Sequence, residues 1–176
     1  MLLSEHILAA WNRFESLQQL ETFLGDSQAP DNVFSFERIV ATDRAGTYPE
    51  EGFRALNDWG FQQYYIPEQL GGKYRSCEEN FLLMRLIARR DLTLAISHGK
   101  TYLGSMPIWI AGDQAQQRQV AEWIAAGERV ALGLTEESNG SDLLSGTFTA
   151  VQQGDDFELS GRKWLVNHAI KGEMIV

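Results

Sequence analysis

The 176-residue sequence has a single cysteine, Cys77, which excludes an intrachain disulfide framework and argues against a thiolate metal site. Its three histidines, His6, His98 and His168, lack the spacing of metal ligands, so we expect no metal site and assign His98 to a packed core or pocket wall. The sequence also lacks the apolar run of roughly 18–20 residues that a membrane-spanning helix needs, and it lacks a signal-peptide pattern. We therefore expect a cytoplasmic protein with no membrane span.

Positive charge is also scarce, because 15 Lys and Arg stand against 24 Asp and Glu, for a net charge of -9 at pH 7. A nucleic-acid binder normally presents a basic face, so we expect no nucleic-acid partner. Hydrophobic residues, in contrast, make up 44% of the chain. That content and length suffice for the core of one domain, or of one domain and part of a second.

Helical periodicity dominates the chain up to residue 127. Apolar residues recur at helical spacing from Leu3 to Leu20, with Gly25 as the predicted end, and a helix opened by Pro49 ends at Gly60. Segment 61–66 is short and apolar. Further helices are predicted near residues 36–40, 76–90, 93–111 and 113–127, and Pro107 is expected to kink or restart the third of them.

The pattern changes after residue 127. Strands are predicted at residues 130–134, 147–153, 157–159, 163–166 and 174–176, around a polar loop at 135–146 and a hairpin turn at 154–155. We therefore predict an α+β protein, in which an all-α amino-terminal domain (1–127) precedes the start of an antiparallel β domain (128–176). Such a sheet would have open edges, so we expect a longer chain or a second polypeptide to complete it.

The most informative segment, residues 132–142, reads LGLTEESNGSD. A loop of this kind can surround the polar edge of a flat ring, because its backbone donates and accepts hydrogen bonds and Thr135 adds a hydroxyl. A solvated surface loop is the simpler alternative, since polar loops are common. Glu136 and Glu137 form a candidate general-base pair, but exposed loop carboxylates are the default expectation.

Four motifs resemble those of the acyl-CoA dehydrogenase family, in the family's order. Residues 132–142 are similar to its T-E-P-x-x-G-S-D signature, and residues 161–167 (GRKWLVN) to its G-x-K-x-[WF]-[IV]-[ST]-N strand. Residues 66–72 (IPEQLGG) resemble its [VI]-P-E-x-x-G-G turn, and residues 88–95 (ARRDLTLA) its A-R-x-D-x-S-x-A helix join. Each motif is weak alone, but the four together make the resemblance specific over residues 45–176.

The resemblance implies a fold and a cofactor. The family has an amino-terminal helical domain, a middle β domain and a carboxy-terminal four-helix bundle. This chain would hold the helical domain and part of the β domain, and it would lack the bundle. The implied cofactor is FAD, and Ser141 would also bind the substrate. By position in the motifs, the implied flavin contacts are Leu132, Leu134, Thr135, Gly140, Ser141, Leu165 and Asn167.

The resemblance also implies a reaction, the α,β-dehydrogenation of an acyl thioester, in which a carboxylate removes the α-proton and a hydride passes to FAD. The family's base lies in the bundle, so no catalytic residue is assigned here. The implied partners are an acyl thioester carried by coenzyme A or a carrier protein, an electron acceptor, and a carboxy-terminal-half polypeptide or a homo-oligomer. The implied setting is fatty acid metabolism.

Departures from the family pattern support a second hypothesis. ESN at residues 137–139 replaces the usual Pro-Gly-Ala stretch, Asn167 replaces a Thr or Ser, and Leu165 lacks the aromatic ring that usually packs against flavin. The alternative to an enzyme subunit is therefore a non-catalytic interaction or binding module that kept the fold and lost the flavin. A truncated full-length dehydrogenase is a third possibility, and a copurified yellow flavin would favour an enzyme.

Overall fold

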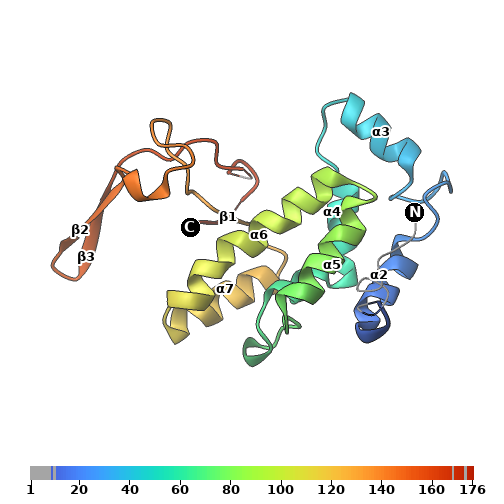
Figure 1. Cartoon of the computed structure of the whole chain (residues 1–176), viewed down its shortest axis with the longest axis horizontal. Helices are drawn as coiled ribbons and strands as arrows, with labels where there is room; N and C mark the ends of the chain where they lie inside the picture. Colours follow the sequence, from blue (N-terminus) through green and yellow to red (C-terminus); the bar gives the residue numbers. More distant parts are fainter. Residues whose placement is uncertain (1–8, 10, 168, 173) are drawn as a thin grey trace.

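The computed structural model describes residues 9, 11–167, 169–172 and 174–176, and it shows a helical body with a β region beside it (Figure 1). The prediction of an α+β fold is confirmed. The division at residue 127 into two domains stays a prediction. The helices are α2 (Glu15–Leu24), α3 (Phe36–Arg44), α4 (Glu50–Trp59), α5 (Cys77–Ala88), α6 (Leu92–Ala111) and α7 (Gln114–Ala125). Three 3-10 helices are η1 (Phe61–Tyr65), η2 (Glu68–Leu70) and η3 (Leu143–Ser145), and the strands are β1 (Val130–Ala131), β2 (Thr149–Gln153), β3 (Asp156–Ser160) and β4 (Met174–Ile175).

Local capping signals start two of the helices where the sequence predicts. Asp113 and Gln116 form a complete capping box at α7. Ser76 caps α5, because its hydroxyl oxygen accepts the Glu79 amide at 3.1 Å. Glu79 does not return a bond to Ser76, since its buried carboxylate instead accepts the Ser16 hydroxyl of α2 at 2.5 Å. The capping sequence therefore also ties α5 to α2.

The core lies where α4, η1, α5 and α6 meet. His98 is buried on α6, and its ring stacks on Phe53 of α4 with the ring centroids 4.3 Å apart. Phe61 of η1 meets the same imidazole edge-on at 5.1 Å. The assignment of His98 to the core is therefore confirmed. Within the described part of the chain, no three His, Cys, Asp or Glu side chains are grouped to hold a metal, and even α6 is not apolar enough to cross a membrane.

One prediction of helix continuity is wrong, and another is narrowed to one of its alternatives. Phe14 has φ -110° and ψ 100°, which is extended backbone, so the predicted first helix is interrupted and α2 begins at Glu15. Pro107 does not restart a helix, because α6 continues through it, and the alternative of a kink stays a prediction. Proline has no amide to donate to the Leu103 carbonyl four residues earlier. Three residues of the first predicted helix, Leu3, Ile7 and Leu8, lie outside the described residues.

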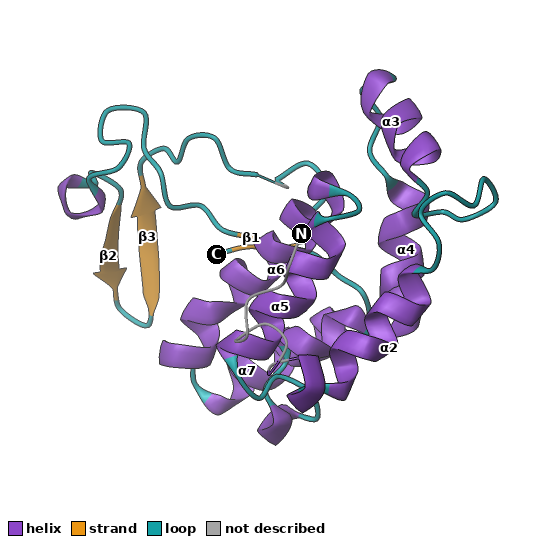
Figure 2. Ribbon diagram, turned by 45° about the vertical axis from the view of Figure 1, so that its right-hand side comes forward, coloured by secondary structure: helices purple, strands orange, loops and turns teal. Residues whose placement is uncertain are grey.

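Among the described residues, the β region consists of two separate pairs of strands. β2 and β3 form the expected antiparallel hairpin, which stands apart from the α-helices in both views (Figure 1 and Figure 2). β1 pairs with β4 in parallel, with Val130 opposite Met174, which the sequence did not predict. β1 also packs on α6, because a Cβ added to Gly104 would lie 2.7 Å from Val130 Cγ1. The polar loop after β1 is thereby anchored to the helical body.

The predicted strand at residues 163–166 is wrong, because this segment is a loop. Leu165 has a φ of 53°, which is incompatible with an extended strand. Lys163 turns back instead, and its Nζ atom donates to the Leu134 carbonyl oxygen at 3.1 Å. This bond runs from the loop to a residue 29 positions earlier, so strand-like composition gave no indication of it.

The Asp91 cap of α6 allows a first prediction. The buried Asp91 carboxylate accepts the amides of Thr93 and Leu94 at 2.8 and 3.1 Å. Replacing Asp91 with Ala removes both bonds, so we expect the free energy of unfolding to fall by about 1 kcal/mol. Urea unfolding measures this change, and a variant as stable as the wild type would contradict the assigned role of the cap.

Candidate functional site

Two segments that are about 30 residues apart in the sequence lie side by side after β1. The Thr135 carbonyl oxygen accepts the Trp164 amide at 2.7 Å, and the Leu134 carbonyl oxygen accepts Lys163 Nζ at 3.1 Å. The Gly133 amide donates to the Val176 carbonyl oxygen at 2.8 Å, which holds the start of the loop beside β4. We call the meeting of residues 134–135 with residues 163–165 the loop junction.

The structure brings some of the predicted site residues together and leaves others apart. Leu134, Thr135 and Leu165 belong to the loop junction, and the half-buried Leu132 lies two residues before it. Gly140 and Ser141 lie in an exposed turn that is closed by the Asp142 amide on the Asn139 carbonyl oxygen at 2.9 Å. In the described residues, no hydrogen bond links that turn or the exposed Asn167 to the loop junction.

Glu136 departs most clearly from its predicted environment. The prediction of an exposed carboxylate is wrong, because Glu136 is only 5% exposed, whereas Glu137 is exposed as expected. The Lys163 ammonium group, followed by the Thr147 and Phe148 amides and the Thr147 hydroxyl, lowers the pKa of Glu136 to about 2. A carboxylate that is so acidic and so fully bonded is a poor proton acceptor at neutral pH. The two glutamates therefore do not form a general-base pair.

The backbone at Leu165 is strained. A φ of 53° places a branched side chain in the left-handed region, which costs roughly 1–2 kcal/mol. Leu165 is 77% exposed, so burial of its side chain does not offset this cost. Strained backbone persists where neighbouring contacts fix it, and such positions gather at ligand sites. Here the hydrogen bond from the Trp164 amide to the Thr135 carbonyl oxygen fixes the residue immediately before Leu165.

The groups at the loop junction fit the polar edge and apolar face of a flavin ring. The hydroxyls of Thr135 and Ser141 have no hydrogen-bond partner among the described residues, so they are available to a ligand. Leu134 and Leu165 expose apolar surface at the loop junction, where Thr135 lies, whereas Ser141 lies in the separate turn. A flat ring with alternating donors and acceptors at its edge matches this combination of hydroxyls, backbone groups and apolar side chains.

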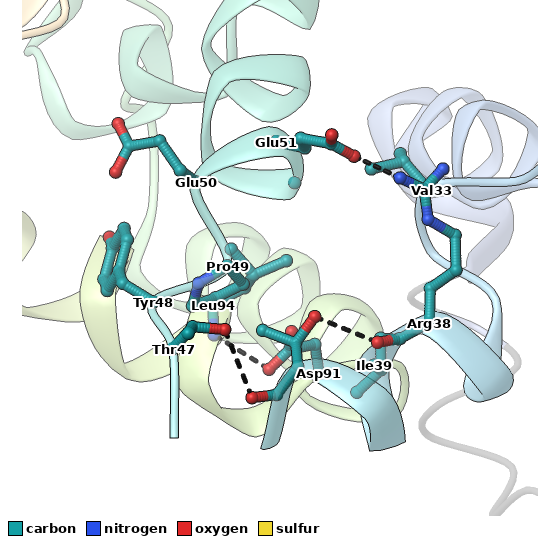
Figure 3. Close-up of a pocket in the computed structure, with 12 residues that line it drawn as sticks. Val33, Arg38, Ile39, Thr47, Tyr48, Pro49, Glu50, Glu51, Asp91 and Leu94 are labelled. Atoms are coloured by element: carbon teal, nitrogen blue, oxygen red, sulfur yellow. Dashed lines mark hydrogen bonds and ion pairs between the residues drawn. The ribbon is translucent and has the colours of Figure 1, made fainter. Parts of the chain in front are cut away.

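A cleft in the helical body is a second candidate, and the sequence gave no indication of it. It encloses about 270 Å³ between α3, α4 and the start of α6 (Figure 3). Its charged groups are already engaged: Arg38 pairs with Glu51, and Asp91 caps α6. The Thr47 hydroxyl donates to the Thr42 carbonyl oxygen at 3.4 Å. This cleft therefore offers less reactive chemistry than the loop junction does.

Comparisons with known proteins agree on one family. The family described as acyl-CoA dehydrogenase, N-terminal domain, matches residues 35–128. The probable acyl-CoA dehydrogenase fadE25 of Mycobacterium leprae is 32% identical over 127 residues, which are 71% of this chain and 33% of that protein. The chain thus spans about a third of the length of this curated relative.

Solved structures share the fold. Butyryl-CoA dehydrogenase from Megasphaera elsdenii superposes with a TM-score of 0.74 at 22% identity, over 90% of this chain and 42% of that one. The prolyl acyl carrier protein oxidase AnaB superposes with a TM-score of 0.75 at 18% identity, over the whole of this chain and 44% of that one. At these identities the likeness establishes the fold alone.

Proposed function

Because the chain belongs to the acyl-CoA dehydrogenase family, we propose that it forms the amino-terminal part of an FAD-dependent enzyme that dehydrogenates an acyl thioester at its α,β bond. The observation that carries this proposal is the loop junction, where Leu134 and Thr135 lie against the segment of Lys163 and Trp164. When bound, FAD supplies the hydride-accepting chemistry. The residues of this chain would position the ring.

Each proposed contact has a distinct physical role. Thr135 and Ser141 offer hydroxyls to the ring edge, and Asn167 offers an amide. Leu132, Leu134 and Leu165 offer apolar surface, while Gly140 leaves room for close approach, since a Cβ there would meet nothing within 4 Å. Ser141 is also the proposed substrate contact. These assignments follow from the motifs, and the geometry of the loop junction supports those of Leu134, Thr135 and Leu165.

The remaining components form part of the same proposal. The proton-accepting carboxylate would come from outside these 176 residues, supplied by a carboxy-terminal-half polypeptide or by further residues of a longer chain. The protein would pair with that polypeptide or form a homo-oligomer. The acyl group would be carried by coenzyme A or a carrier protein, and the reduced cofactor would pass its electrons to a separate acceptor. We place this activity in cytoplasmic fatty acid metabolism.

The Thr135 hydroxyl provides a direct test. Replacing Thr135 with the isosteric Val removes one hydrogen bond, so we expect the Kd for FAD to rise about five- to tenfold, while Thr135→Ser stays within about twofold. Fluorescence titration of FAD against the purified protein measures both values. Thr22→Val is the matched control, because this exposed hydroxyl lies on α2, in the helical body. A wild-type protein that binds no FAD would refute the proposed function.

A further inference from the structure

A single buried carboxylate connects the two halves of the loop junction. Glu136 is 5% exposed, although Glu137 and Ser138 beside it in the same polar loop are exposed. Burial of a carboxylate is unfavourable unless hydrogen bonds and a counter-charge compensate for it. The position of Glu136 inside the loop therefore requires specific partners.

The two carboxylate oxygens bind different parts of the β region. Oε2 accepts the Thr147 amide at 2.6 Å and the Thr147 hydroxyl at 2.8 Å. Oε1 accepts the Phe148 amide at 3.0 Å and Lys163 Nζ at 2.9 Å. A Cβ added to Gly146 would lie 3.2 Å from Oε1, so the backbone approaches closely there. Glu136 thus holds the residues before β2 and the segment after β3 around one point.

Lys163 extends this connection to the proposed flavin contacts. The same Nζ atom that binds Glu136 donates to the Leu134 carbonyl oxygen at 3.1 Å, and the next residue, Trp164, donates its amide to Thr135 at 2.7 Å. Leu134 and Thr135 immediately precede Glu136, and the strained Leu165 immediately follows Trp164. Through Lys163, Glu136 is therefore connected to both sides of the loop junction, next to Leu134 and Thr135 on one side and Leu165 on the other, which are proposed to contact flavin.

We propose that Glu136 is a positioning residue for the flavin edge, which fixes the separation between residues 134–135 and residues 164–165 without contacting the ring. This inference rests on the proposed function and deepens it. A carboxylate is required because only a group with acceptors on both oxygens satisfies two amides, a hydroxyl and an ammonium group together. Glutamine presents an NH₂ group to some of these donors and cannot replace it.

The test compares Glu136→Gln with Glu137→Gln, a neighbouring variant that makes the same charge change at an exposed site. Amide hydrogen exchange of the purified protein should show Trp164 and Phe148 exchanging at least about tenfold faster in Glu136→Gln, with the amides of α5 unchanged. The Kd for FAD should rise at least about tenfold. At saturating FAD, the visible absorption bands of Glu136→Gln should also differ from those of the wild type, because the ring edge is held differently.

The outcomes separate this inference from the proposed function. If the wild type binds no FAD, the proposed function fails, and the exchange rates still decide whether Glu136 fixes the two segments. Equal exchange and equal FAD affinity in the two variants would overturn the inference. Faster exchange with unchanged FAD affinity and spectrum would also overturn it, because Glu136 would then stabilise the fold alone.

Discussion

Replacing Gly72 with alanine should lower the free energy of unfolding by about 3 kcal/mol, at the upper end of the effects of overpacking. A Cβ at this position would lie 2.0 Å from the Ile66 carbonyl oxygen and 2.4 Å from Ile66 Cβ. The Ile66 oxygen cannot move away freely, because it accepts the Tyr74 amide at 2.9 Å. The added methyl group must therefore displace backbone between η1 and α5. Urea unfolding followed by far-UV circular dichroism measures the change.

Gly71 provides the matched control for this prediction. Gly71 has a φ of 87°, and a Cβ there would meet nothing within 4 Å. Alanine at Gly71 should therefore cost only the conformational strain of the left-handed region, roughly 1–2 kcal/mol. If Gly72→Ala were no more destabilising than Gly71→Ala, the close packing at Ile66 would be disproved.

The second large effect is expected for Arg129→Met, which should destabilise the protein by about 2–3 kcal/mol. Arg129 lies directly before β1 and its side chain is 12% exposed. Its Nη2 atom donates to Glu50 Oε1 of α4 at 3.0 Å, and its guanidinium carbon lies 4.1 Å from the centroid of the Phe53 ring. Methionine keeps much of the apolar contact but leaves the partly buried Glu50 without its main cation. Urea unfolding at pH 7 measures the difference.

The control for Arg129→Met replaces Arg54, a second arginine that pairs with the Glu50 carboxylate. Arg54 also pairs with Glu50, at 3.6 Å, but its side chain is 74% exposed. Solvent screens such a pair, so Arg54→Met should change the free energy of unfolding by less than about 0.5 kcal/mol. Equal effects of the two arginine variants would contradict a specific role for Arg129 in joining α4 to β1.

The effect of Arg129→Met should depend on pH. Burial raises the pKa of Glu50, but the hydrogen bond and charge of Arg129, with the charges of Lys171 and Arg54, outweigh it and leave the pKa below its ordinary value of 4.5. A carboxyl group whose pKa is lowered by folding contributes stability above its unfolded pKa, and this contribution is lost as the pH falls through the folded value. The difference between wild type and variant should therefore be full at pH 7 and shrink in acid.

Local signals account for the parts of the fold that the sequence predicted. Ser76 and Asp113 cap α5 and α7 through residues two or three positions away, and Gly60 ends α4 with a φ of 91°. Each signal acts within one helical turn, so it is readable from the sequence. The parallel pairing of β1 with β4 joins residues 44 positions apart, and neither strand's two residues specify that partner.

The candidate site was predictable in its location but not in its internal contacts. The motifs directed attention to Thr135 and to residues 161–167, and the structure places Thr135 beside residues 163–165, although it leaves Asn167 apart from them. They gave no indication that Glu136 is buried, because its partner Lys163 lies 27 residues later in a segment with strand-like composition. The left-handed backbone of Leu165 was equally hidden, since leucine gives no local signal for a positive φ.

The visible absorption spectrum and intact mass of the natively purified protein test the central claim most directly. The account predicts a yellow complex with flavin absorption, in which this chain occurs with a second polypeptide or as part of a longer one. Thr135, Glu136 and Ser141 would then be the first residues to replace. A colourless, stable species of 19.8 kDa that does not bind added FAD would contradict the assignment of a flavin site to the loop junction.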